Sequence, residues 1–109
     1  MMGFKSVNIN EAVIEIQKGA VIIDVREKNE YSEAHIKDSI LVPLSTVSAA
    51  KINEINSENK LIIIHCRSGK RSKVAANILI SQDYKGEILE IDDGIIGWIE
   101  NNQPVIADL

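Results

Sequence analysis

The strongest constraint on the fold is a pair of short apolar runs, at residues 21–25 and 61–64, in which β-branched side chains follow one another without alternating with polar ones. Runs of this kind are typical of strands buried on both faces of a parallel sheet. A shorter strand is expected at residues 40–42, where Pro43 ends it, and an alternating one at residues 87–91. The run at 61–64 is the most apolar and is expected at the centre of the sheet.

Helical patterns separate these strands along the chain. Asn10 is suited to cap a helix at residues 11–18 that Gly19 ends, and Ser45 to cap a helix at residues 46–55. Three further helices are expected, at residues 27–34, 72–81 and 95–100. Strands that alternate with helices predict an α/β fold, whose central parallel sheet has helices on both faces.

The composition is that of one globular domain over residues 1–109. Hydrophobic residues make up 45% of the chain and charged residues 26%, close to the average for such domains. The apolar runs are far shorter than the roughly 20 residues of a membrane helix, so no membrane association is expected. One cysteine and two histidines are too few for a structural zinc site. We therefore expect a cytoplasmic protein with neither metal nor cofactor.

Positive charge is concentrated in one segment. The net charge is −4, which argues against nucleic acid as a partner. Residues 59–82 nevertheless contain no Asp or Glu and carry five Lys and Arg residues. A basic segment in an acidic chain predicts a small anionic ligand or an acidic partner there. The alternative is a solvated basic helix face without a ligand.

The lone cysteine, Cys66, directly follows the predicted central strand, where parallel sheets bind their ligands. Gly69 lets the turn after it take a positive φ, and the N–H groups of such a turn form a nest for an anion. The following helix adds free N–H groups and the positive end of its dipole. These groups predict a stabilised Cys66 thiolate that acts as a nucleophile without a neighbouring base. The alternative is a Cys66 buried as a small apolar side chain.

Residues 66–72, Cys-Arg-Ser-Gly-Lys-Arg-Ser, resemble the active-site loop of single-domain rhodaneses, which are thiosulfate sulfurtransferases. Two further motifs match in order: Asp-Val-Arg at 24–26 with the segment up to Pro43, and Asp-Gly-Ile at 93–95 followed by Trp98. The resemblance covers about residues 8–104. It implies a rhodanese-like fold with a central parallel sheet of about five strands and helices on both faces.

The chain departs from the family's pattern at three turns. Ala34 stands where the family has a glycine, Asp38 and Ser39 replace its Gly-Ala pair, and Asp93 replaces the first glycine of its C-terminal pair. Asp tolerates positive φ better than most residues do. These differences concern the local backbone more than the chemistry.

The resemblance also implies a reaction. Cys66 would be the catalytic residue, taking the outer sulfur of thiosulfate or another small anionic persulfide donor and carrying it as a persulfide. The substrate-binding residues that it implies are Arg67, Ser68, Gly69, Lys70, Arg71 and Ser72. Because the chain has no second cysteine, the sulfur must pass to an external acceptor: a small thiol, cyanide or another protein's cysteine.

Several nearby residues have structural interpretations beside functional ones. Asp24 and Arg26 are expected to form hydrogen bonds or an ion pair that fixes neighbouring loops, with Arg26 as an anion contact the alternative. Ser72 is interpreted as a helix cap, with a hydrogen bond to the sulfur as the other possibility. His65 is expected to face the opposite side of the sheet from Cys66, and Trp98 to lie in the core.

Two other functions remain open at this point. Cysteine phosphatases and arsenate reductases also hold an anion in a cysteine loop, but their pattern has Arg six positions after Cys. Ser72 occupies that position here and Arg71 comes one residue early, which makes a smaller loop. The third possibility is a non-catalytic binding module, because rhodanese-like domains that lose the cysteine survive as adaptors; the retained Cys66 argues against it.

Overall fold

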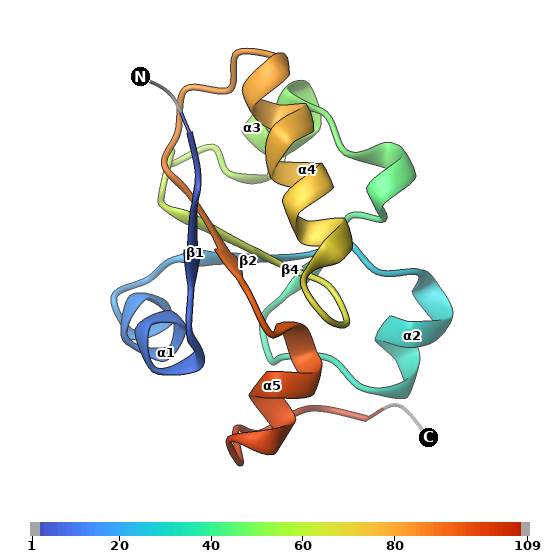
Figure 1. Cartoon of the computed structure of the whole chain (residues 1–109). Coiled ribbons are helices and arrows are strands. Elements are labelled where there is room, and N and C mark those ends of the chain that lie inside the picture. The colour runs from blue at the N-terminus through green and yellow to red at the C-terminus, as the bar shows by residue number, and fades with distance from the viewer. Residues whose placement is uncertain (1–2, 108–109) are drawn as a thin grey trace.

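The computed structural model describes residues 3–107, which form a five-stranded sheet with helices on both faces (Figure 1). All strand pairs are parallel, and the order across the sheet is β1-β5-β4-β2-β3. The strands are β1 (Lys5–Val7), β2 (Val21–Asp24), β3 (Ile40–Leu41), β4 (Ile62–His65) and β5 (Ile88–Ile91). The predicted central position of the most apolar run is confirmed, because β4 is the middle strand.

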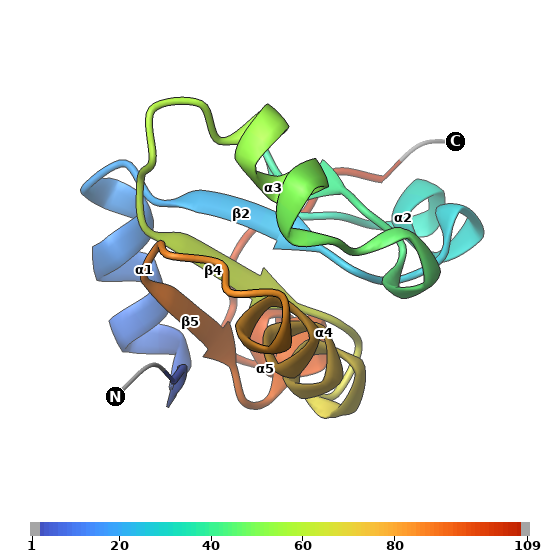
Figure 2. The same cartoon turned by 90° about the horizontal axis from the view of Figure 1, so that it is seen from above.

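Helices cover the sheet from both sides. They are α1 (Ile9–Gln17), α2 (Lys28–Glu33), α3 (Ala49–Ile55), α4 (Lys70–Ser81) and α5 (Gly94–Glu100), with a short 3-10 helix η1 (Leu44–Thr46). One core cluster joins the sheet to α3 and α4, and the other joins it to α1 and α5 (Figures 1 and 2). The carboxyl ends of β2, β4 and β5 lead into α2, α4 and α5, so these loops meet at one edge of the sheet.

The central strand shows why the apolar runs predicted this architecture. Ile62, Ile63 and Ile64 are each at most 1% exposed, and their alternation places Ile63 in one core cluster and its two neighbours in the other. Burying a side chain of this size stabilises the fold by about 2 kcal/mol. A strand with apolar residues on both faces is stable only between two helical layers.

Three helices begin two or more residues away from the position expected from the sequence. The cap of α1 is Asn8 rather than Asn10, because Asn8 and Glu11 form a reciprocal capping box. The segment after Pro43 is a 3-10 turn, and α3 begins only after Ser48, whose hydroxyl accepts from the Lys51 N–H. The helix expected from residue 72 begins at Lys70, with Gly69 as its N-cap.

Two strand predictions were also incomplete. The sequence analysis did not identify β1, which is three residues long and lies against β5. The alternation expected for residues 87–91 is wrong as a statement about burial. All four residues of β5 are buried, because β5 lies between β1 and β4 and under helices on both faces.

Candidate active site

Cys66 follows β4 directly and begins the loop 66–69 that leads into α4. The residue is 1% exposed, and its sulfur accepts a 3.1 Å hydrogen bond from the Gly69 backbone N–H. Burial alone would raise the pKa of the thiol. Hydrogen bonds from the backbone N–H groups of Ser72, Gly69 and Ser68 oppose burial, and the pKa of Cys66 lies below its ordinary value.

The start of α5 fixes the direction of the loop's peptide groups. The Ile95 N–H donates to the Cys66 carbonyl at 2.9 Å, and the Ile96 N–H donates to the Arg67 carbonyl at 3.2 Å. With these carbonyls bound by α5, the next N–H groups of the loop are free to face the sulfur. We call the N–H groups around the Cys66 sulfur its cradle. The cradle therefore depends on α5 as well as on the residues of the loop.

Two glycines permit this close packing. Gly94 has φ +62°, and a Cβ there would lie 2.3 Å from the Arg67 carbonyl oxygen. Gly69 has φ +100°, and a Cβ there would lie 2.1 Å from the Asp92 carbonyl oxygen. Each glycine is thus required both for its backbone conformation and for the contact between the loop and the turn before α5.

The departures from the rhodanese turn pattern fit the backbone. Ala34 is extended, with φ −165°, which any residue adopts. Asp38 takes φ 67°, in the left-handed region that Asp tolerates. Asp93 has φ −89°, so the positive φ of that turn falls on Gly94. Asp38 is therefore the only one of these three residues with a left-handed φ.

The basic residues divide into paired and exposed ones. Arg71 donates two hydrogen bonds to the Glu30 carboxylate, at 2.7 and 2.9 Å, and this pairing lowers the pKa of Glu30 to about 2. Lys73 binds Glu90 and Asp92. Arg67 and Lys70 are exposed, and neither forms an ion pair within residues 3–107. No carboxylate within residues 3–107 therefore neutralises their charges through an ion pair.

Asp24 and Arg26 form a buried ion pair behind the loop. Their closest nitrogen and oxygen atoms lie 2.8 Å apart, and the side chains are 0% and 6% exposed. Arg26 also donates to the Ala34 carbonyl at 2.7 Å. Its contact with Glu30 is to the backbone carbonyl, while the Glu30 carboxylate binds Arg71. This pair therefore ties the loop after β2 to α2.

His65 lies beside that pair. Its Nε2 is 3.5 Å from the Asp24 carboxylate, and it is fully buried. Burial lowers the pKa of His65 and outweighs the opposing effect of Asp24, so the ring is neutral. Trp98 is 5% exposed in the core, as expected, and its indole N–H donates to the Pro104 carbonyl.

Ser72 does not cap α4, because it lies inside the first turn and the cap is Gly69. Its hydroxyl oxygen is 3.6 Å from the Cys66 sulfur and 2.6 Å from a carboxylate oxygen of Glu90. Sequence reasoning did not single out Glu90. The available signal was a lone acidic residue within the otherwise apolar strand Ile88–Ile91.

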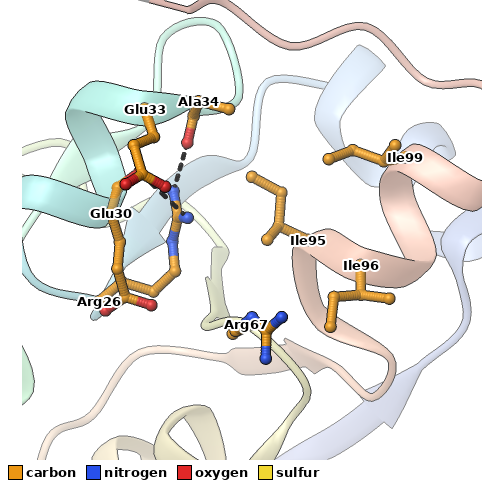
Figure 3. A pocket seen from close by; sticks show the side chains of 8 residues that line it. All are labelled: Arg26, Glu30, Glu33, Ala34, Arg67, Ile95, Ile96 and Ile99. Carbon is orange, nitrogen blue, oxygen red and sulfur yellow. Dashed lines mark hydrogen bonds between the residues drawn. The ribbon is translucent and has the colours of Figure 1, made fainter.

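A cavity of about 280 Å³ opens beside the loop, between α2 and α5 (Figure 3). Isoleucines of α5 form one side of it, and charged side chains from α2 and the loops form the other. Its lining residues are Arg26, Glu30, Glu33, Ala34, Arg67, Ile95, Ile96 and Ile99. The cavity thus offers an apolar wall and a charged wall next to the Cys66 loop.

Across the predicted site, the structure brings Cys66, Gly69 and Ser72 into direct contact. Arg67, Ser68 and Lys70 are exposed around them.

No helix within residues 3–107 is long and apolar enough to cross a membrane.

The structure thus defines an α/β domain with a cysteine loop between its central parallel strand and a helix. Comparison with known families is more specific: the Rhodanese-like domain family matches residues 9–101. The chain belongs to this family.

Individual relatives agree with this assignment. A protein of Allochromatium vinosum named sulfurtransferase is 31% identical over 87 residues, which is 80% of this chain and 78% of that protein. The thiosulfate sulfurtransferase GlpE of Haemophilus influenzae is 27% identical over 95% of this chain and 96% of its own. The crystal structure of a rhodanese-related protein from Thermoplasma volcanium has a TM-score of 0.81 at 30% identity, covering 96% of this chain and all of that one.

Some relatives are longer. YrkF of Bacillus subtilis is 38% identical over 77 residues, which is 71% of this chain but only 40% of YrkF. The chain also spans 20% of a Porphyra purpurea relative. The domain therefore occurs both by itself and as one part of larger proteins.

Proposed function

We propose that this chain is a thiosulfate sulfurtransferase, which moves a sulfane sulfur from thiosulfate or another persulfide donor to a thiol or cyanide acceptor. The observation that carries the proposal is the Gly69 N–H at 3.1 Å from the Cys66 sulfur, in a loop whose hydrogen bonds lower the pKa of that thiol. The names of the relatives from Allochromatium vinosum and Haemophilus influenzae support the same reaction class.

The first half-reaction loads the cysteine. The Cys66 thiolate attacks the outer sulfur of thiosulfate and forms a new S–S bond. The S–S bond of thiosulfate breaks, and sulfite leaves with its electron pair. The negative charge now lies on the terminal sulfur of the persulfide, and the free N–H groups of loop 66–69 stabilise it there.

The second half-reaction removes the sulfur from the Cys66 persulfide. An acceptor thiolate or cyanide attacks the terminal sulfur, and Cys66 leaves as a thiolate. A lowered thiol pKa makes Cys66 a better leaving group in this step. The chain has one cysteine, so it forms no internal disulfide and the acceptor is an external molecule.

The exposed cations supply the attraction for the donor. Arg67 and Lys70 carry charges that are free to meet a dianion at the mouth of the loop. Arg71 contributes less to that field because Glu30 neutralises it. We assign substrate binding to the loop N–H groups and to Arg67 and Lys70, and a structural role to the ion pair of Asp24 and Arg26.

The geometry favours sulfur transfer over phosphate ester hydrolysis. A phosphatase loop aims an arginine at the phosphate oxygens, whereas Arg71 turns to Glu30 and Ser72 occupies the following position. The single free thiol also suits a reducing compartment, and we propose the cytoplasm.

Intact mass spectrometry after incubation with thiosulfate tests the proposal. We expect the chain to gain one sulfur atom and to lose it again on addition of cyanide or a thiol. The Cys66→Ser variant is the matched control and should gain nothing. Hydrolysis of an aryl phosphate without sulfur uptake would instead support a phosphatase. A lack of both activities together with binding to another protein would support an adaptor.

A further inference from the structure

Glu90 is a buried carboxylate that the proposed mechanism does not use. It is 0% exposed and lies on β5, whose other residues are apolar. Its carboxylate accepts hydrogen bonds from the hydroxyls of Ser6 on β1 and Ser72 on α4, and its nearest contact with the Lys73 ammonium is 3.1 Å. Burying a carboxylate is costly unless it is paired and hydrogen-bonded, so these contacts are what keeps it there.

Ser72 connects this carboxylate to the reactive sulfur. Its hydroxyl oxygen lies 2.6 Å from Glu90, 3.1 Å from the Gly69 carbonyl oxygen and 3.6 Å from the Cys66 sulfur. A serine hydroxyl has one proton to donate and two lone pairs that accept. Three groups therefore surround a single proton.

The shortest of these contacts decides where the proton lies. A hydrogen bond to a carboxylate is shorter and about twice as strong as a neutral one. At 2.6 Å the Ser72 hydroxyl donates to Glu90, and its lone pairs face the sulfur. In this orientation the Cys66 S–H donates to Ser72, which favours the protonated thiol. To stabilise a thiolate, the hydroxyl must turn away from Glu90.

We propose that Glu90 is a positioning residue, which competes with the Cys66 sulfur for the hydroxyl proton of Ser72 and thereby limits how readily that sulfur ionises. The inference rests on the proposed role of Cys66 as the reacting thiol. A thiolate that is stabilised less is a stronger nucleophile. Glu90 therefore makes each thiolate more reactive toward the sulfur donor and makes the thiolate population smaller.

Few other charges act on this group. Within residues 3–107, Glu90 forms one ion pair, with Lys73, and the same ammonium lies 2.7 Å from a carboxylate oxygen of Asp92. Hydrogen bonds and ion pairs with Asp92 and Glu90, opposed by burial, raise the pKa of Lys73, so it stays cationic. If Glu90 is made neutral, Lys73 keeps Asp92 as its partner. A neutral replacement therefore changes mainly the hold on Ser72.

The test is a titration of the thiolate by its ultraviolet absorbance in Glu90→Gln, with Cys66→Ser as the blank. An amide holds the Ser72 proton more weakly than a carboxylate does, so we expect the midpoint of Cys66 to fall by about one pH unit. Below the midpoint this is about a tenfold larger thiolate fraction. Glu87→Gln is the matched control, because Glu87 is an exposed carboxylate just before β5; its midpoint should stay at the wild-type value.

The background Ser72→Ala separates a relay through the hydroxyl from a direct effect of charge. We expect Glu90→Gln to add no further shift there. An equal shift in both backgrounds would overturn the relay, and so would an unchanged or raised midpoint in Glu90→Gln alone. Should Glu90→Gln fail to fold, the titration of Ser72→Ala alone tests the proposal. We expect the midpoint of Cys66 to change little in that variant. A tenfold loss of thiolate would overturn the proposal, because it would mean that the Ser72 hydroxyl donates to the sulfur in the wild type.

The rate of sulfur loading gives a second measurement. Well above the midpoint, where every thiol is ionised, Glu90→Gln should load sulfur from thiosulfate more slowly than wild type, because its thiolate is less nucleophilic. A variant that is only less stable would show a lower unfolding temperature with unchanged titration. Failure of the wild type to take up sulfur would refute the proposed function but leave the titration result standing, so the two failures are distinguishable.

Discussion

Substitution of Gly94 by alanine should loosen the cradle of Cys66 without altering any residue in it. A Cβ on Gly94 would lie 2.3 Å from the oxygen and 2.4 Å from the carbon of the Arg67 carbonyl, both of them backbone atoms. The turn before α5 must therefore move away from the loop, which breaks the hydrogen bonds that Ile95 and Ile96 donate.

The magnitude follows from these contacts. A left-handed φ costs a non-glycine residue about 1 kcal/mol, and each lost hydrogen bond costs about 1 kcal/mol. Gly94→Ala should therefore lower the free energy of unfolding by about 3 kcal/mol, which leaves most domains of this size folded. The pKa of Cys66 should rise toward its ordinary value, because the freed loop carbonyls no longer hold the N–H groups toward the sulfur.

Gly19→Ala is the matched control. Gly19 also has a positive φ, +103°, but a Cβ there meets no atom within 4 Å. Urea unfolding and thiolate absorbance are measured on both variants. If Gly94→Ala loses no more stability than Gly19→Ala, or if its thiol titrates as in the wild type, then α5 does not organise the loop and the reasoning is wrong.

Three further outcomes are expected. The pKa of Glu30 is lowered to about 2 from 4.5, so its pair with Arg71 should stabilise the fold above about pH 4.5 and lose that effect as pH falls toward 2. For a partly exposed pair, we expect a contribution of about 1 kcal/mol to the free energy of unfolding in urea, and Glu30→Gln should remove this contribution. Arg67→Ala should raise the KM for thiosulfate more than it lowers kcat, with a larger effect at low ionic strength, and a fall in kcat alone would contradict this. Ile63→Ala should lower the free energy of unfolding by about 2 to 5 kcal/mol, because the site is fully buried between two layers; a loss below about 1 kcal/mol would refute that account of the central strand.

The architecture could be predicted because its signals are local. The isoleucine run of β4 and Gly69 after Cys66 each predict their local structure from a few neighbouring residues. By contrast, β1 has only Val7 buried and exists through pairing with residues 89–91, more than 80 positions away. A three-residue strand with one buried side chain has no periodicity to detect.

The same distinction applies to the site. The position of Cys66 followed from the end of a strand and a turn, but the partners of nearby charges did not. Arg71 meets Glu30, 41 residues earlier, and Ser72 meets Glu90, 18 residues later. Such pairs depend on how three loops meet at the sheet edge, and charge counts in the sequence do not show which basic residues remain unpaired.

The anchoring of the Cys66 loop by α5 has a consequence for the chain as it is synthesised. Residues 92–96 leave the ribosome after the cysteine and after all five strands. Until they arrive, the peptide carbonyls at 66 and 67 lack the donors that orient them in the folded domain. The conformation of the Cys66 loop is therefore completed only when the last helix of the domain packs against it.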